Sequence, residues 1–145
     1  MVIGIANDHG GVDMKEKLVS YLEDLGYNVI NYGTDSTDSV DYPIYAFKVG
    51  EEVRDKKIDV GILICKSGIG MSIAANKVKG VRCARVDTKE DAIVTREHNH
   101  SNVLALSANI AIDVAKEIVI NFIQTDYSEE ERHVRRVRMI DEYDN

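Results

Sequence analysis

The sequence predicts a three-layer α/β/α domain with a five-stranded parallel sheet and an extra C-terminal helix. Short runs rich in β-branched residues alternate along the chain with longer runs whose apolar residues recur at helical spacing. The third short run, at 60–65, is apolar throughout, which indicates a strand covered on both faces. Strict alternation favours parallel strands, and right-handed connections then place helices on both faces of the sheet.

The first half of the chain supplies two predicted strands, at 2–6 and 28–32. Between them lies a predicted helix whose apolar residues are Met14, Leu18, Leu22 and Leu25. Gly26 follows that helix as a C-cap glycine would. Pro43 is expected in the first turn of a second helix, because proline is favoured at that position.

The second half continues the alternation and ends in an additional helix. After the strand at 60–65, its expected elements are a helix at 71–78, a strand at 81–86, a helix at 88–97, a strand at 102–106 and a helix at 110–123. The last helix is expected to open on a capping box, with Ser128 at the N-cap and Glu131 three residues on, and to continue to about Tyr143. This order of elements is typical of a Rossmann-like domain.

Length and charge limit the classes of protein that the chain can belong to. The 145 residues fit one domain, placed at 1–145 because no Gly/Ser-rich linker or low-complexity stretch divides them. The chain carries 18 Lys and Arg against 25 Asp and Glu, a formal net charge of −7. This acidity argues against a protein that coats nucleic acid or an anionic membrane, since neutralising phosphates needs an excess of basic groups. A phosphorylated partner would have to meet a local basic cluster.

Cysteine content and the N-terminal segment bear on location. Two cysteines in a chain of this length do not make a disulfide framework, and they favour a reducing compartment. The first residues lack a basic segment followed by an apolar one, and no apolar run approaches the ~18 residues of a membrane span. We therefore expect a cytoplasmic protein.

The ends of the predicted strands are the places to look for a site, because parallel sheets of this kind bind ligands beyond the carboxyl ends of their strands. The first strand ends at Asn7, Asp8 and His9, and the third ends at Cys65. The segment 97–102, before the fifth strand, is also polar. If the first and third strands are neighbours, an acid, an imidazole and a thiol meet in one crevice, which suits proton transfer.

Cys65 has two interpretations. Most unpaired cysteines are small core residues, and its place at the end of an apolar strand fits that role. The alternative is a catalytic thiolate, because the amides of a helix N-terminus and the neighbouring Lys66 would favour the charged form. A thiolate can take a proton from carbon. Cys83 lies in mid-strand with no such turn, and we expect it to be structural.

Two glycine-containing turns carry alternatives of the same kind. The turn Ser-Gly-Ile-Gly at 67–70 is either a tight connection or a cradle of backbone amides for a developing oxyanion. The segment 8–11 is either a helix N-cap followed by glycines or part of the site. Asp8 would repel a phosphate wrapped by the first loop, which argues against flavin- and nucleotide-binding proteins of this fold. A phospho-receiver domain would need an aspartate where Cys65 stands.

His98 and His100 flank Asn99 near the predicted fifth strand. They match no established metal-ligand spacing, so an imidazole acting as acid or base is preferred to a metal ligand. Neither histidine is favoured by position alone.

Arg132 and Arg136 belong to the only dense basic segment of this acidic chain. Their spacing puts two guanidinium groups on one face of a helix, an arrangement that fits a phosphate dianion. Ion pairing with neighbouring acidic residues explains the same pattern, at ~0.5 kcal/mol per exposed pair.

Six short motifs follow one another along the chain in an order that is specific in combination. They are Asn-Asp-His-Gly-Gly at 7–11, Asp-Tyr-Pro at 41–43, Gly-Ile-Leu-Ile-Cys-Lys-Ser-Gly-Ile-Gly at 61–70, Ser-Ile-Ala-Ala-Asn-Lys at 72–77, Glu-His-Asn at 97–99 and Asn-Val-Leu-Ala at 102–105. In combination they resemble the type B ribose-5-phosphate isomerases, and the resemblance runs from residue 1 to about residue 140. The same broader family includes galactose-6-phosphate and allose-6-phosphate isomerases.

The resemblance implies an aldose–ketose isomerase of the pentose phosphate pathway that works through a cis-enediolate and needs no cofactor or metal. It implies that Cys65 moves a proton between C1 and C2 of the open-chain sugar, and that Ser67 helps move the proton between O1 and O2. His98 would open the furanose ring. The amides that would hold the enediolate oxygen are those of Ser67, Gly68, Ile69 and Gly70.

The resemblance also implies a set of substrate contacts. The phosphate ligands would be His9, Arg132 and Arg136. Asp8 would contact the sugar hydroxyls, Asn99 would contact the substrate through its amide, and Tyr42 would form a wall of the pocket. The site of the family is completed across a dimer interface, so a homodimer is implied, with a tetramer as the alternative.

The chain departs from the family pattern at two places. Asn109 stands where many members carry an additional phosphate-contacting arginine, which weakens one contact. Lys66-Ser67 stands where others often have Gly-Thr, which keeps the hydroxyl and adds a cation. We include Lys66 and Asn109 among the candidate substrate-binding residues. Two alternatives stay open: a six-carbon substrate such as allose or galactose 6-phosphate, and a sugar-phosphate-binding module without turnover.

Overall fold

The computed structural model describes residues 1–143 of the chain. Its strands are β1 (Val2–Asn7), β2 (Asn28–Asn31), β3 (Val60–Cys65), β4 (Cys83–Arg85) and β5 (Val103–Ser107). Its helices are α1 (Val12–Asp24), α2 (Tyr42–Arg54), α3 (Ile69–Ala75), α4 (Lys89–Asn99), α5 (Ile112–Gln124) and α6 (Glu131–Glu142), and the 3-10 turn η1 (His9–Gly11) precedes α1. None of the helices among the described residues is long and apolar enough to cross a membrane.

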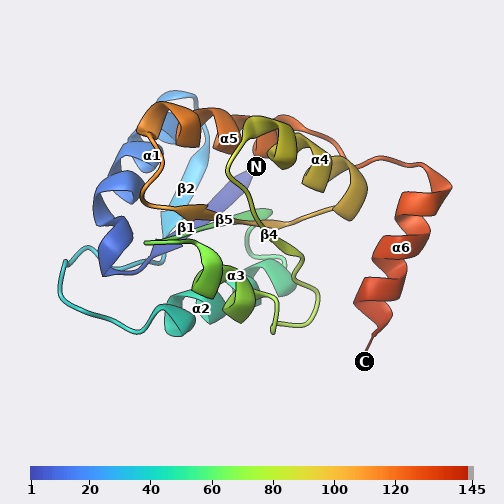
Figure 1. Ribbon diagram of the computed structural model, residues 1–145, viewed down its shortest axis with the longest axis horizontal. Coiled ribbons are helices and arrows are strands. Elements are labelled where there is room, and N and C mark those ends of the chain that lie inside the picture. The colour runs from blue at the N-terminus through green and yellow to red at the C-terminus, as the bar shows by residue number, and fades with distance from the viewer. Residues whose placement is uncertain (144–145) are drawn as a thin grey trace.

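The strands form one five-stranded, all-parallel sheet in the order β2-β1-β3-β5-β4. α1, α4 and α5 cover one face and α2 and α3 the other, so the predicted three-layer fold is confirmed (Figure 1). β1 is a neighbour of β3, with Asn7 paired to Ile64. On the other side of β3, Cys65 pairs with Ser107 of β5. The carboxyl ends of β1, β3 and β5 therefore lie side by side.

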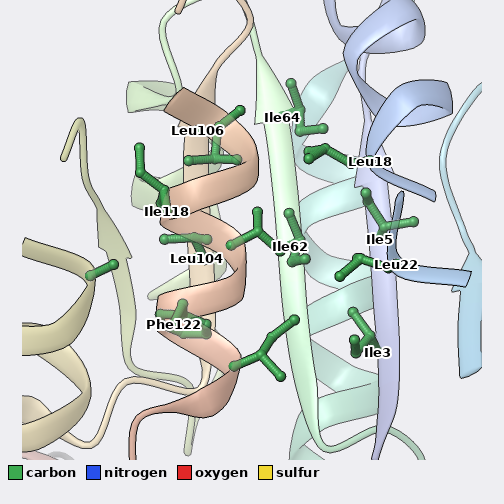
Figure 2. Close-up of a cluster of buried hydrophobic side chains, with 14 of the residues drawn as sticks. Ile3, Ile5, Leu18, Leu22, Ile62, Ile64, Leu104, Leu106, Ile118 and Phe122 are labelled. Atoms are coloured by element: carbon green, nitrogen blue, oxygen red, sulfur yellow. The ribbon is translucent and has the colours of Figure 1, made fainter. Parts of the chain in front are cut away.

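The central strand β3 is buried along its whole length, which confirms that it is covered on both faces. Ile62 and Ile64 pack into the cluster under α1 and α5, together with residues such as Leu18 and Phe122 (Figure 2). Cys65 belongs to the second cluster, under α2 and α3. Burial of one Leu, Ile or Phe side chain contributes roughly 1.5–3 kcal/mol, so two apolar layers fix the position of this strand.

Two turn residues behave as their types predict. Gly26 has a φ of +92° and follows the last turn of α1. Its amide and that of Tyr27 donate back to carbonyls of the same helix, so glycine relieves a conformation that strains other residues. Pro43 stands in the first turn of α2, where its missing N–H is not needed.

The predicted capping box at Ser128 is wrong. α6 begins at Glu131, and its N-cap Glu130 makes no side-chain cap hydrogen bond. Ser128 lies in the link after α5, where its amide donates to the carbonyl of Glu97 in α4 at 3.1 Å. Its hydroxyl accepts from the Glu130 amide at 3.1 Å. Contact with α4 thus holds Ser128 outside the helix, and this tertiary contact overrides the local capping signal.

The edge strand β4 covers 83–85 and is shorter than the predicted 81–86. The side chain of Asn76 hydrogen-bonds to both backbone polar groups of Cys83. It accepts from the Cys83 amide at 2.8 Å and donates to the Cys83 carbonyl at 2.9 Å. Asn102 Oδ1 accepts from the Arg82 amide at 2.8 Å. Side-chain amides therefore satisfy these backbone groups of Arg82 and Cys83, while β4 pairs with β5.

α6 lies beside α4 and projects away from the sheet (Figure 1). The ring of His133 stacks on His98 of α4, and Arg82 pairs with Asp141 at 2.8 Å. Met139 of α6 is 66% exposed. The helix is therefore held near both of its ends and still has apolar side chains that face solvent.

Candidate active site

A cleft of about 440 Å³ opens at the carboxyl ends of β1 and β3. Its lining residues come from the N-cap of η1, the start of α2, the end of β3, the turn that follows β3, and α3 itself. They are Asp8, Tyr42, Cys65, Lys66, Ser67, Ile69, Gly70 and Ile73. Seven of the predicted site residues are thus brought together by the fold. Because β1 and β3 are neighbours, the acid Asp8 and the thiol Cys65 meet in this cleft as predicted, but its lining residues include no histidine, so the predicted imidazole does not join them.

Cys65 is the last residue of β3 and is 5% exposed. The amide of Gly68 donates to its sulfur at 3.1 Å. The Cys65 carbonyl accepts from the amide of Ala108 at 2.9 Å, which ties the residue to the segment after β5. An N–H donor favours the charged over the neutral form of the group that accepts from it. The thiol is both held in place and provided with a donor that suits a thiolate.

The turn after Cys65 requires glycine at position 68. Gly68 has a φ of +76°, and a Cβ there would stand 2.9 Å from the carbonyl carbon of Leu106. The hydroxyl of Ser107 donates to the Lys66 carbonyl at 2.7 Å, so β5 anchors this turn from below. The backbone of the turn is therefore fixed by its neighbour strand rather than by its own propensity.

The amides of the turn divide into two groups. Those of Gly68 and Ile69 donate to the Cys65 sulfur and, at 3.2 Å, to the Ser67 hydroxyl. The hydrogen bonds of the described chain include none from the amides of Ser67 and Gly70. Both residues line the cleft. Gly70 is in the first turn of α3, where amides have no acceptor within the helix, and Ser67 precedes the N-cap Gly68. These two amides are suited to receive an oxyanion.

Tyr42 opens α2 and closes the cleft against Gly70. A Cβ on Gly70 would stand 2.6 Å from two carbons of the Tyr42 ring, so ring and backbone are in close contact. Tyr42 is 38% exposed and forms one side of the cleft.

Asp8 and His9 follow β1 directly. Asp8 is 8% exposed, and its carboxylate accepts from the Gly10 amide at 2.9 Å, so it caps η1 and lines the cleft at once. His9 is exposed, and its Nδ1 accepts from the Val40 amide at 3.2 Å. A backbone amide can only donate, so the neutral ring carries its proton on Nε2. That nitrogen is then a hydrogen-bond donor.

Arg85, the last residue of β4, was not singled out from the sequence. Its Nε donates to the Ser67 carbonyl at 2.7 Å, and its Nη1 pairs with Asp87 at 2.8 Å. A cation at the carboxyl end of a strand is a signal that sequence reading could have used. The pairing of β4 with β5, which brings it to the turn, was not readable.

Other predicted residues lie elsewhere on this chain. His98 and Asn99 are exposed in the last turn of α4. This turn precedes the start of β5, where the Asn102 carbonyl accepts from the amide of Gly61 at the start of β3. His98 and Asn99 therefore lie near the amino ends of the strands, whereas Cys65 lies at the carboxyl end of β3.

The basic pair on α6 and the polar residue after β5 are also outside the cleft. Arg132 and Arg136 are exposed on α6, and Arg132 pairs with Glu130 at 3.0 Å. Asn109 is exposed after β5, at the same edge as the cleft, and its amide donates to the Ser107 hydroxyl.

Cys83 and His100 lie in surroundings that fit a structural role. Burial raises the pKa of the Cys83 thiol to about 12, so it stays neutral at ordinary pH. His100 bonds the Ser128 carbonyl at 2.9 Å and stacks on Tyr127. Within residues 1–143 no three or more His, Cys, Asp or Glu side chains are grouped to hold a metal ion.

Comparison with known proteins places this chain among its relatives. A family model described as Ribose/Galactose Isomerase matches residues 3–140. The chain belongs to the ribose/galactose isomerase family. Ribose-5-phosphate isomerase B of Escherichia coli is 40% identical over 139 residues, 95% of this chain and 93% of that protein. The resemblance found in the sequence is confirmed, and the chain is an enzyme of the isomerase class.

Solved structures of this family have the same fold. Ribose-5-phosphate isomerase B of Clostridium thermocellum matches with a TM-score of 0.95 and 43% identity, covering 98% of this chain and 96% of that one. The Mycoplasma genitalium enzyme, solved with bound ribulose-5-phosphate, matches with a TM-score of 0.92 and 38% identity, covering 98% and 95%.

Proposed function

We propose that the protein interconverts D-ribose 5-phosphate and D-ribulose 5-phosphate through a cis-enediolate, with the Cys65 thiolate as base and without a metal ion. The observation that carries this proposal is the Cys65 sulfur in a cleft at the carboxyl edge of the sheet, with the Gly68 amide donating to it at 3.1 Å. Family membership and the ribulose-5-phosphate bound by the Mycoplasma genitalium relative support the choice of substrate.

The proton transfer follows from the groups in the cleft. The thiolate takes the proton from C2 of the open-chain aldose, the electron pair forms the C1–C2 double bond, and the carbonyl oxygen O1 becomes the oxyanion. The thiol then returns the proton to C1, while the Ser67 hydroxyl carries a proton from O2 to O1. The amides of Ser67 and Gly70 face the oxyanion, and loss of one such donor costs roughly 3 kcal/mol. Asp8 and Tyr42 hold the sugar between them.

A second copy of the chain completes the site. His98 is assigned to ring opening. It lies near the amino ends of the strands, whereas Cys65 of the same chain lies at their carboxyl ends, so the two cannot serve the same cleft. Ile69 and Ile73, which line the cleft, are 51% and 63% exposed, and α6 presents Met139 in the same way. A homodimer would cover these apolar side chains and bring His98 and Asn99 of one copy to the cleft of the other. A tetramer of two such dimers is the alternative.

The phosphate is held by His9, Arg132 and Arg136. His9 follows Asp8, which lines the cleft, and its Nε2 is a donor that a phosphate oxygen could accept. Arg132 and Arg136 come from α6, whose exposed guanidinium groups are presented on one face. The Arg132–Glu130 pair would have to give way to the phosphate, at the small cost of an exposed ion pair.

The base is tested by a matched pair of cysteine variants. Cys65→Ala is expected to abolish isomerisation and retain the fold, whereas Cys83→Ala retains activity. Wild-type enzyme in deuterated water should also place deuterium at C2 of recovered ribose 5-phosphate. Full activity of Cys65→Ala would refute the assignment. A protein that binds the substrate but exchanges no hydrogen would be a binding module.

The shared site is tested by mixing two inactive variants. Cys65→Ala and His98→Gln are each expected to be inactive alone. If each cleft uses one Cys65 and one His98 from different copies, subunit exchange yields hybrid dimers with one intact cleft, and about a quarter of wild-type activity returns. No recovery in hybrids confirmed by native mass spectrometry contradicts a shared site.

Substrate and metal are tested by direct comparison of rates. Ribose 5-phosphate should be turned over faster than allose 6-phosphate or galactose 6-phosphate, and the opposite ranking would favour a six-carbon isomerase. Treatment with a chelator should leave the rate unchanged. A rate that falls with chelator and returns with a divalent cation would establish metal dependence.

A further inference from the structure

Arg85 ends the edge strand β4, yet its side chain reaches the turn that follows β3. β5 lies between these two strands in the sheet, and Arg85 pairs with Ala105 of β5. The guanidinium Nε donates to the Ser67 carbonyl at 2.7 Å, and its Nη1 is held by the Asp87 carboxylate at 2.8 Å. Arg85 therefore contacts the catalytic turn while lining no part of the cleft.

The peptide unit between Ser67 and Gly68 is held from both of its ends. Its carbonyl accepts from Arg85, and its N–H donates to the Cys65 sulfur at 3.1 Å. A trans peptide is planar, so its C=O and N–H point in opposite directions. Fixing the carbonyl on the Arg85 side therefore fixes the N–H on the thiol side.

Glycine at position 68 does not hold this peptide orientation by itself. Turns that differ by a flip of the central peptide differ in the sign of φ at the following residue, and glycine adopts both signs readily. Gly68 has a φ of +76° here. A flipped peptide would turn its N–H away from Cys65 and would break the hydrogen bond from Arg85 to the Ser67 carbonyl, so the Arg85 contact favours the observed orientation.

We propose that Arg85 is a positioning residue for Cys65, acting through the Ser67–Gly68 peptide. Its first effect is geometric, since it holds the Gly68 amide against the sulfur. Its second effect is electrostatic, because a charge-assisted hydrogen bond to the carbonyl polarises the peptide and strengthens the N–H donor at its other end. The inference rests on the proposed function in so far as Cys65 is the catalytic base.

The other charged and titratable groups around Cys65 form a constant background. Asp8 at the N-cap of η1, Tyr42 from α2 and the adjacent Lys66 line the same cleft. A substitution at Arg85 leaves these three in place. A change in thiol reactivity on substitution of Arg85 therefore reports on the peptide between Ser67 and Gly68.

The test measures the alkylation rate of Cys65 by iodoacetamide against pH, in a Cys83→Ala background. Arg85→Met is expected to move the midpoint of the profile to higher pH by about one unit, with roughly tenfold slower alkylation below the midpoint. Arg85→Lys keeps a charge but not the planar fork, and should fall between. Arg54→Met is the matched control, because Arg54 also pairs with a nearby aspartate, Asp55 at 2.9 Å, and its profile should overlay the parent.

Steady-state kinetics separate positioning from substrate contact. Arg85→Met should lower kcat while leaving KM for ribose 5-phosphate little changed, since Arg85 does not line the cleft. An Arg85→Met protein with native circular dichroism and an unshifted thiol profile would overturn the inference. If Arg85→Met does not fold, the NMR chemical shift of the Gly68 amide proton is compared between Arg85→Lys and the parent protein. An unchanged chemical shift would also overturn the inference. If every protein alkylates as expected but none isomerises, the proposed function fails and the role of Arg85 stands.

Discussion

The imidazole ring of His98 stacks on that of His133, with centroids 4.2 Å apart and planes 10° from parallel. His98 is exposed at the end of α4, whereas His133 is 6% exposed at the start of α6. The two rings join the helix that carries the proposed ring-opening residue to the helix that carries the proposed phosphate clamp. The orientation of His98 thus depends on whether α6 is docked.

The docking of α6 should weaken in mild acid. Burial, and then the nearby His98 and Arg132, lower the pKa of His133 below its usual 6.5. The folded protein therefore takes up this proton less readily than the unfolded chain. The stability contributed by neutral His133 is fully present above about pH 6.5 and is lost as the pH falls towards the lowered pKa.

His133→Phe keeps a flat ring beside His98 and removes the titration. Thermal midpoints measured between about pH 5.5 and 7.5 should fall more steeply with acid for wild type than for this variant. Parallel curves for the two proteins would show that His133 does not couple α6 to pH.

The two cysteines should differ sharply in reactivity. Burial raises the pKa of Cys83 to about 12, so at pH 8 it is almost entirely thiol and a poor nucleophile. Iodoacetamide at pH 8 is expected to add one label, which peptide mapping places on Cys65. Cys65→Ala should take up none. Label on Cys83 under these conditions would contradict the structural role given to it.

Gly68→Ala should be more damaging than Gly80→Ala. Both glycines have positive φ, +76° and +86°, so alanine costs about 1–2 kcal/mol of backbone strain at either place. A Cβ at Gly68 would also stand 2.9 Å from the Leu106 carbonyl carbon, whereas nothing lies within 4 Å of one at Gly80. Urea denaturation should show the larger loss for Gly68→Ala, and that variant alone should lose activity. Equal losses would mean that β5 does not constrain the turn.

Lys15 anchors the loop that leads to Tyr42. It is 1% exposed, and its ammonium donates to the Thr34 carbonyl at 2.8 Å and to the Asp35 carboxylate. Lys15→Met should cost roughly 1–3 kcal/mol, because the buried side of the loop loses its donor. Lys17→Met removes only an exposed pair with Asp13 and should cost about 0.3–0.5 kcal/mol. Denaturant midpoints compare the two, and indistinguishable values would remove the anchoring role.

The sequence revealed most of what local chemistry controls. The fully apolar β3 was recognised as a covered strand, and Cys65 at its end was located at the correct edge of the sheet. Gly26 and Pro43 were assigned correctly, because a positive φ and a missing N–H act within one turn of chain.

What sequence reading missed depends on contacts between distant segments. Ser128 carries a capping signal, but its amide is taken by Glu97 of α4. Arg85 acquires its partner Ser67 only once β5 is inserted between β3 and β4. His98 precedes a strand rather than following one, so the rule about carboxyl ends does not apply to it, and its distance from Cys65 on the same chain appears only in three dimensions.

The side chain of Asn76, which fills both backbone groups of Cys83, also limits how the protein can aggregate. An exposed strand edge with free N–H and C=O groups invites another chain to add a strand and extend the sheet without limit. Here the amide of one residue stands in the place of that incoming strand, and only a short strand remains beside it. Strand addition at β4 is therefore disfavoured, so copies of this chain are expected to associate through their helices instead of forming an extended sheet.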